Sequence, residues 1–443
     1  MDQGRASAPA GPTLLGVPMA AVLVVVLAAT FPLVQLVKTV VDRATTVRDA
    51  TGTVHFVSDG RAAQLVQLGA GVLAAAVATH LLVRSLRAGT FQVTSWSLLA
   101  FFVLLAEVVR GRSEPSTLVY GGLTLLVLLA AGVVRLDARA VGRVGTVAGL
   151  TALSAVLFAV LDPVRGWAAC RADKCTPAGG LLRGYFPQEN VLGMFLAALL
   201  PAVAFIDRPL WRRTSLALVV AAILLTGSRT AVAVTVLALW SYAVVRRRAT
   251  RSRHGDAAKV VGALPLLTFV VSGVLVFSLP DMALTGRGLI FRVVREAWLD
   301  QPLLGPGREA LYDAYYSSMA NWYLAHEHGQ GAYVLGQAGV VGVLLFLLAL
   351  GGILRACWRS GGPVPVVFAT APALGFLTEP IWEVSLLSPY VLTLFLTVVL
   401  VSQTLRGDRS LPESLAQAQV AAVPAPGVAP TAPRATLTPA PSP

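Results

Sequence analysis

The chain has 443 residues, of which 56% are hydrophobic and only 13% are charged. A soluble domain carries about 25% charged residues, so this composition excludes an ordinary globular protein. The formal net charge of +13 would favour nucleic-acid binding in a soluble protein, but in a membrane protein basic residues collect in the loops that stay in the cytoplasm. We therefore expect an all-α polytopic membrane protein that lies in a lipid bilayer and binds no nucleic acid.

Apolar runs of about 20 residues are long enough to cross a bilayer as a helix. Residues 1–12 are polar and are expected in the cytoplasm, and the apolar run that follows them is too long for the core of a signal peptide. The domain 13–405 is predicted to contain about twelve transmembrane helices, at 13–37, 62–83, 89–109, 117–134, 143–161, 189–206, 210–227, 230–246, 260–279, 332–354, 363–378 and 388–405.

Basic residues predict the orientation of these helices. With the N-terminus inside, the loops assigned to the cytoplasm contain the strongly basic segment 246–259 and arginine pairs or triplets at the other turns. These arginines are Arg84, Arg87, Arg135, Arg139, Arg143, Arg208, Arg212, Arg213, Arg355, Arg359, Arg406 and Arg409. Both termini are therefore expected in the cytoplasm, and the Ala- and Pro-rich segment 406–443 is predicted to be a disordered cytoplasmic tail.

Between Arg213 and Arg246 only 32 residues remain for two helices, 210–227 and 230–246. A single long helix would place one strongly basic flank outside, whereas a hairpin keeps both flanks inside. We therefore expect a hairpin with "TGSRT" as its turn. Arg229 of this turn then lies at the outer membrane surface, which is an unusual place for an arginine.

The longest external segment is predicted at 280–331 and contains an amphipathic helix. Pro302, Gly305 and Gly307 are expected to end this helix, and Arg287 is expected just before its start. Five residues at helical spacing form an apolar stripe for packing on the bundle or on lipid, namely Ile290, Phe291, Val294, Ala297 and Trp298.

Arginines in an external segment oppose the positive-inside tendency and need an explanation. Ion pairs with acids close in sequence explain Arg292, Arg295 and Arg308; these acids are Glu296, Asp300, Glu309 and Asp313. Arg229 and Arg287 have no acid within a helical turn of sequence. Because guanidinium groups bind phosphate oxygens in bidentate fashion, these two arginines predict a diphosphate site on the outer face.

Two of the five histidines, His326 and His328, end the external segment just before an apolar run. A histidine at a water–membrane boundary is suited to accept a proton near neutral pH, although a surface histidine satisfied by water is the simpler interpretation of either one. The two histidines and the lone Glu327 match no common pattern of metal ligands, so no metal is expected.

Cys170 and Cys175 lie in one polar loop, and Cys357 lies elsewhere. If this loop faces an oxidising exterior, the pair forms a small disulfide; otherwise the two residues are unpaired thiols. A short loop gains little stability from closure, so the sequence leaves both alternatives open.

Four segments, in this order, resemble the O-antigen ligase and polymerase family of bacterial envelope glycosyltransferases, over about residues 60–400. "FPQENVLGMFLAALLPAV" (186–203) is similar to an Asn–x–x–Gly span with a mid-span proline, and "LLTGSRTAVAV" (224–234) to a Ser–Arg–Thr turn. "LTGRGLIFRVVREAWLDQPLLGPG" (284–307) resembles a Gly–Arg, amphipathic-helix and Pro–Leu–x–Gly–x–Gly segment. "HGQGAYVLGQAGVVG" (328–342) resembles a His–Asn segment that precedes Gly–x–x–Gly.

In that family the histidine stands eleven residues before the first glycine of Gly–x–x–Gly, and counting back from Gly339 gives His328 and not His326. The asparagine that follows the family's histidine is Gly329 here, which is a departure from the motif. The resemblance implies a GT-C-like enzyme of the bacterial cytoplasmic membrane that uses no metal or other cofactor. Such an enzyme moves a glycan from an undecaprenyl-diphosphate-linked donor to a hydroxyl of a glycan or glycolipid acceptor on the outer face.

The resemblance also implies roles for individual residues. His328 would be the general base on the acceptor hydroxyl. Arg229 and Arg287 would hold the diphosphate and stabilise its charge as it leaves. Asn190 would lie near the site, and two further arginines of the external segment, Arg292 and Arg295, would extend the substrate site.

A transporter of lipid-linked glycans or of small anions is the main alternative. It should place ionisable groups or broken helices near the bilayer midplane, whereas Glu107 and His80 lie near span ends and no predicted span has a charge at its centre. A purely structural scaffold would leave Arg229, Arg287 and His328 unexplained. The sequence does not distinguish a ligase from a polymerase, because no motif identifies the acceptor.

Overall fold

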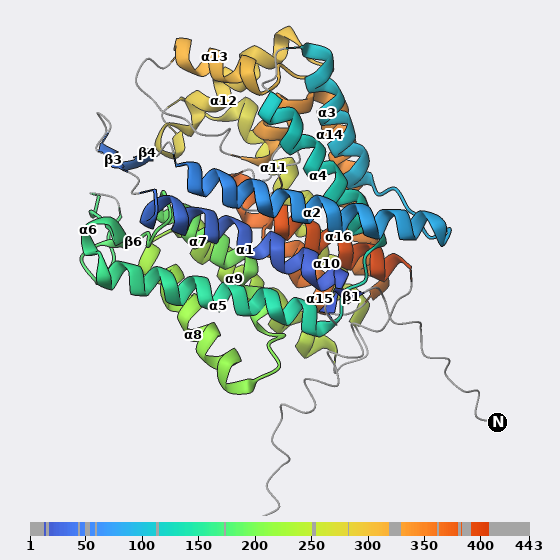
Figure 1. The fold of residues 1–443 in the computed structure, drawn as a ribbon. Coiled ribbons are helices and arrows are strands. Elements are labelled where there is room, and N and C mark those ends of the chain that lie inside the picture. The colour runs from blue at the N-terminus through green and yellow to red at the C-terminus, as the bar shows by residue number, and fades with distance from the viewer. Residues whose placement is uncertain are drawn as a thin grey trace, which may run out of the picture.

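The computed structural model describes residues 13–14, 17–42, 45–48, 54–57, 60–111, 115–171, 174–249, 254–281, 283–318, 329–360, 363–379, 382 and 391–406. These residues are mainly helical (Figure 1). Three short antiparallel hairpins accompany the helices: β1–β2 (Thr13–Leu14, Val17–Pro18), β3–β4 (Thr45–Arg48, Val54–Val57) and β5–β6 (Trp167–Ala168, Leu181–Leu182).

Helices follow one another along the described chain. In chain order they are α1 (Met19–Val40), α2 (Arg61–Arg87), α3 (Ser95–Arg110), α4 (Pro115–Val133), α5 (Ala138–Leu161), α6 (Pro163–Gly166), α7 (Glu189–Val203), α8 (Pro209–Thr226), α9 (Arg229–Ala249), α10 (His254–Gly262), α11 (Leu264–Ser278), α12 (Ala283–Asp300), α13 (Arg308–Ser318), α14 (Gln330–Ser360), α15 (Pro363–Thr370), the 3₁₀ helix η1 (Ala373–Leu377) and α16 (Val391–Leu405).

Among the described residues, seven helical segments are long and apolar enough to cross a membrane, and four shorter apolar helices accompany them. Apolar side chains that face outward fit a lipid environment: in α2, Leu65, Leu68 and Val72 are each more than 60% exposed. The chain is therefore an all-α polytopic membrane protein. Each of the twelve predicted spans coincides with at least one helix, while the count of twelve stays a prediction.

Two of the predicted spans are divided between separate helices, and a third, 332–354, is interrupted at Gly339. The span 260–279 is divided between α10 and α11, and Pro265 lies in the first turn of α11. The span 363–378 is divided into α15 and η1, with Pro372 between them. Proline lacks a backbone N–H and clashes with the preceding helical turn, so a helix tends to end just before it.

Small residues hold α5 against α7 and α8. A Cβ atom added to Gly142 or Gly145 would meet the backbone carbonyl of Phe205 or Ala202, and one added to Gly149 would meet the side chain of Ser215. This spacing of small residues lets helix backbones approach closely, which drives association where lipid removes the hydrophobic effect. The packing brings the end of α7 and the start of α8 beside the first half of α5.

Helix ends that the sequence predicts on the same side lie together. At the end predicted to face outside, Thr39 of α1 donates through Oγ1 to the carbonyl of Tyr185 (3.0 Å) and accepts at its own carbonyl from Arg165 (3.0 Å). At the opposite end, Gln403 donates through Nε2 to the carbonyl of Leu136 (3.1 Å). Figure 1 shows β3–β4, α6 and β6 together at the first of these ends.

Candidate functional site

The turn between α8 and α9 has the local geometry that the residues of "TGSRT" favour. Gly227 has φ +61°, a left-handed conformation that suits glycine at the end of a helix. Ser228 caps α9, because its Oγ accepts a hydrogen bond from the amide of Ala231 (3.4 Å), and its own amide donates to Oγ1 of Thr226 (3.2 Å). Arg229 is the first residue of α9 and its side chain is exposed.

Arg287 lies inside α12, which begins at Ala283, and the prediction that it precedes the helix is wrong. The glycines on either side of it in sequence did not prevent the helix, since α12 packs on α11 and α14. The Nη2 atom of Arg287 lies 3.2 Å from Oε1 of Glu379, and both side chains are mostly buried, with 19% and 12% exposed. The two residues are 92 positions apart in the chain, so acids close to Arg287 in sequence could not predict this ion pair.

Thr230, the residue after Arg229, and Arg287 contact adjacent residues of the loop after η1. Thr230, next to Arg229, lies within hydrogen-bonding distance of Thr378, with 3.2 Å between their hydroxyl oxygens. The next residue, Glu379, is the one that pairs with Arg287. The starts of α9 and α12 therefore meet at two neighbouring residues, whose Cα atoms are about 3.8 Å apart.

Asn190 lies beside the same turn, in the first part of α7. Its Oδ1 accepts a hydrogen bond from Nζ of Lys174 (2.8 Å), which also pairs with Glu189 (3.0 Å). A Cβ at Gly227 would be 3.3 Å from Cε of Lys174, so this lysine packs against the α8–α9 turn. The Lys174 side chain is only 8% exposed.

Lys174 belongs to a small ring closed by a disulfide between Cys170 and Cys175. Arg171 of the same ring pairs with Glu189 at 2.9 Å. Sequence reasoning singled out the two cysteines but missed Lys174, whose only local signal is its place directly before Cys175. The structure thus adds a third cation near Asn190 and Arg229.

His326 and His328 lie outside the described residues, and what is described begins again at Gly329. A Cβ at Gly329 would lie 3.4 Å from the ring of Phe291 and from Oγ of Ser272. Gln330, the first residue of α14, bonds twice to the backbone of Trp382: its Nε2 donates to the carbonyl (3.1 Å) and its Oε1 accepts from the amide (2.9 Å). The start of α14 is therefore held next to α12 and to the loop that carries Glu379.

Arg292 and Arg295 contact residues at the end of α11 or just after it, and not the acids predicted for them. Arg292 pairs with Asp281 at 3.3 Å, and Arg295 donates to the carbonyl of Phe277 (3.3 Å). Both partners lie earlier in the chain, because the face of α12 that carries these arginines lies along the end of α11. The predicted pairs with later acids are wrong for Arg292 and, within the described part of the chain, for Arg295. Both residues anchor α12.

Two glycine motifs meet where the external segment crosses α14. Gly339 has φ +58° and ψ −154° inside α14, so the helix is interrupted there. The amide of Val340 donates to the carbonyl of Pro302 (2.9 Å), and the amide of Gly307 donates to the carbonyl of Gly336 (2.9 Å). The two backbones approach so closely at this crossing that a side chain would not fit between them, which accounts for the glycines in both segments.

Arg110, at the end of α3, secures this crossing from the side. Its guanidinium donates to the carbonyls of Leu304 (2.5 Å) and Gln337 (2.9 Å) and pairs with Glu107 (2.7 Å). The pair is buried, with 9% and 5% of the two side chains exposed. An arginine that bonds to two separate backbones fixes their relative position, and this role has no local sequence signal.

In the described ranges, no group of three or more His, Cys, Asp or Glu side chains is placed to hold a metal ion. The chain matches no curated protein and no solved structure. Residues 214–347 match the family model described as O-antigen ligase. This segment contains Arg229, Arg287 and His328 and extends into α14. The match agrees with the resemblance that the motifs indicated: residues 214–347, less than half of the chain, are similar to the O-antigen ligase family.

Proposed function

We propose that this protein is a membrane glycosyltransferase of the O-antigen ligase or polymerase type. It transfers a glycan from an undecaprenyl-diphosphate carrier to an acceptor hydroxyl on the outer face of the bacterial cytoplasmic membrane, with both termini in the cytoplasm. The reaction uses no metal. The donor supplies the only diphosphate in this reaction, so the protein must provide positive charge where that group leaves.

The observation that carries this proposal is the link between the two arginine-bearing helix starts. Thr378 and Glu379 tie α9 and α12 together: Thr378 contacts Thr230, the residue after Arg229, and Glu379 pairs with Arg287. A diphosphate has two groups of oxygens and suits two guanidinium groups held in this way. Lys174, near the α8–α9 turn, supplies further positive charge.

One contact and one helical spacing support a place for His328 beside these arginines. Gly329, the residue after His328, packs on Phe291. Phe291 stands four residues after Arg287 in α12, and residues four apart share a helix face. The matched segment contains both histidines, and the interval to Gly339 selects His328. We therefore assign His328 as the general base and His326 no role in the reaction.

The proposed reaction is a single displacement at the anomeric carbon of the donor. His328 takes the proton of the acceptor hydroxyl, and the acceptor oxygen forms the new glycosidic bond. The bond between the anomeric carbon and the diphosphate oxygen breaks, and its electron pair leaves with the undecaprenyl diphosphate. Arg229 and Arg287 stabilise that leaving group, while base catalysis contributes about 10²–10⁴-fold.

A transporter is less consistent with where the buried charges lie. Among the described residues, each buried charged side chain is at a helix end or in a loop. These side chains are Glu107, Arg110, Lys174, Arg183, Glu189 and Glu379. The interruption of α14 at Gly339 is filled by the backbone of the external segment. It therefore serves to dock that segment, whereas a transporter uses a broken helix to bind cargo at the midplane.

The test is glycan transfer by purified protein in lipid vesicles, with the host's lipid-linked glycans as donor and with EDTA present. We expect His328→Ala and Arg287→Gln to abolish transfer. The matched controls His326→Ala and Arg295→Gln should retain it. His326 is a neighbouring histidine, and Arg295 is an arginine of the same helix that bonds to a backbone carbonyl.

Normal transfer by His328→Ala would disprove the base assignment. Loss of transfer in EDTA that added Mg²⁺ restores would disprove a metal-free reaction. A wild-type protein that moves the lipid or an anion across the bilayer and never transfers glycan would show that it is a transporter.

A further inference from the structure

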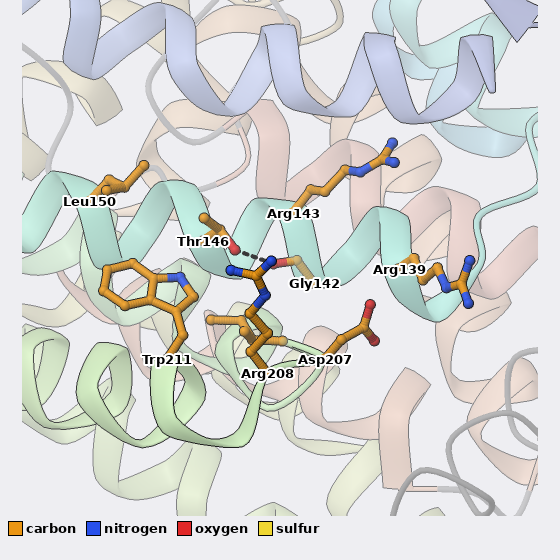
Figure 2. Close-up of a pocket in the computed structure, with 9 residues that line it drawn as sticks. Arg139, Gly142, Arg143, Thr146, Leu150, Asp207, Arg208 and Trp211 are labelled. Atoms are coloured by element: carbon orange, nitrogen blue, oxygen red, sulfur yellow. Dashed lines mark hydrogen bonds between the residues drawn. The ribbon is translucent and has the colours of Figure 1, made fainter. Parts of the chain in front are cut away.

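A cavity with a volume of about 550 Å³ opens at the end of the bundle opposite to the proposed active site. It lies between the first half of α5 and the turn that joins α7 to α8 (Figure 2). The close contacts of Gly142 with Phe205 and of Gly149 with Ser215 bound the region where the cavity opens. The basic loops around it are the ones predicted to face the cytoplasm.

Three arginines line this cavity. Arg139 and Arg143 are one turn apart on α5, and Arg208 comes from the α7–α8 turn. Figure 2 shows the Arg208 guanidinium reaching from the turn towards Gly142 of α5. All three side chains are exposed, and within the described ranges none of them has an ion-pair or hydrogen-bond partner. Asp207 is the single acidic residue of the lining, so the cavity keeps an excess of positive charge.

The lining changes from charged to apolar along α5. Arg139, Arg143, Thr146 and Leu150 follow at helical spacing on one face. The stripe continues beyond the cavity to Leu157 and Leu161 on the same face, and these three leucines are 51%, 50% and 83% exposed. Charge at the membrane surface followed by apolar contacts deeper in the bilayer is the order of groups in a phospholipid.

Trp211 closes the opposite wall of the cavity, from the first turn of α8. In Figure 2 its indole lies across from Leu150, and both side chains lie to the left of the three arginines. Tryptophan is enriched at the membrane interface, where its ring sits at the level of the lipid headgroups. The wall is thus built to contact lipid and not only water.

We propose that this cavity binds an anionic phospholipid of the cytoplasmic leaflet. Its phosphate contacts Arg139, Arg143 and Arg208, and one acyl chain lies along the leucine stripe. Basic pockets between transmembrane helices on the cytoplasmic side are suited to anionic headgroups. A free phosphate would use the arginines but would leave the leucine stripe and Trp211 without a role.

The test measures lipid retention by native mass spectrometry on the delipidated full-length protein. Phosphatidylglycerol is the probe, phosphatidylcholine the neutral comparison, and glycerol phosphate and inorganic phosphate the chain-free comparisons. The cavity variant is Arg139→Gln/Arg143→Gln/Arg208→Gln. The control variant Arg84→Gln/Arg87→Gln/Arg359→Gln removes three exposed arginines from the same predicted membrane face but outside the cavity.

We expect wild type and the control variant to prefer phosphatidylglycerol. An arginine near the surface contributes about 1 kcal/mol to anionic-lipid binding, so the cavity variant should bind phosphatidylglycerol at least about tenfold more weakly. Arg208→Gln alone should give an intermediate loss, which keeps the test valid if the triple variant folds poorly. Equal loss in the control variant, no preference in wild type, or equal binding of glycerol phosphate or inorganic phosphate would each overturn the proposal.

Discussion

Replacement of Gly339 by alanine should undo the docking of the external segment on α14. The backbone at this position has φ +58° and ψ −154°, a conformation nearly restricted to glycine, and forcing another residue into it costs about 1–3 kcal/mol. The new Cβ would also lie 2.5 Å from the amide nitrogen of Gly305 and 2.5 Å from the carbonyl oxygen of Leu303. Relieving such overpacking costs about 1–3 kcal/mol more.

The matched control is Gly351→Ala in the same helix. A Cβ at Gly351 would meet nothing within 4 Å, and alanine in a helix interior stabilises by roughly 0.5–1 kcal/mol relative to glycine. The two substitutions add the same methyl group to α14 and should change stability in opposite directions. In a thermal unfolding experiment Gly339→Ala should lower the midpoint by several degrees, at about 2 °C per kcal/mol for larger domains.

Amide hydrogen exchange locates the effect. The amides of Val340 and Gly307 donate across the crossing to Pro302 and Gly336, each at 2.9 Å. Both amides should exchange faster in the Gly339→Ala variant and at the wild-type rate in the Gly351→Ala variant. Glycan transfer should fall with the loss of protection, because the crossing holds α12 and α14 together. Unchanged protection in Gly339→Ala, with a midpoint equal to that of Gly351→Ala, would refute the reasoning.

Two further predictions concern the charges of the proposed site. Arg287→Lys keeps the charge but loses bidentate contact with phosphate, so kcat/KM for the donor should fall at least about tenfold. Glu379→Gln removes the carboxylate that competes for Arg287 and should lower the donor KM. Steady-state kinetics over a range of donor concentrations measures both effects, and a raised KM in Glu379→Gln would contradict this role of Glu379. Reduction of the protein, or Cys170→Ser/Cys175→Ser, releases the loop that holds Lys174 and removes about 2 kcal/mol of loop-closure stabilisation. The donor KM should then rise with kcat little changed. Equal kinetics in the oxidised and reduced protein would exclude a role for the ring.

Local patterns in the sequence determined the elements of this fold. Apolar runs near the length of a bilayer fall on helices throughout the described chain, because a helix satisfies its own backbone hydrogen bonds in lipid. The "TGSRT" turn follows from glycine and serine at a helix boundary. The amphipathic helix ends at Asp300, just before Pro302, as its composition predicts.

Several features depended on contacts that no local pattern records. The partner of Arg287 lies 92 positions away, and the partners of Arg292 and Arg295 lie earlier in the chain and not later. Lys174 gained its place near Asn190 through the packing of one loop on the start of α7. Each of these pairs forms because two helix ends happen to be adjacent after packing, so sequence distance is a poor guide to them.

The sequence by itself therefore determined the class of protein, the order of its helices and the family motifs, including the interval that selects His328. Only the tertiary structure decided which charges are paired and that the glycines of the external segment and of α14 form one crossing. It also decided that Arg139, Arg143 and Arg208 share a cavity. The physical reason is that helix formation depends on neighbouring residues and the bilayer, whereas the position of each side chain relative to distant ones depends on how the helices pack.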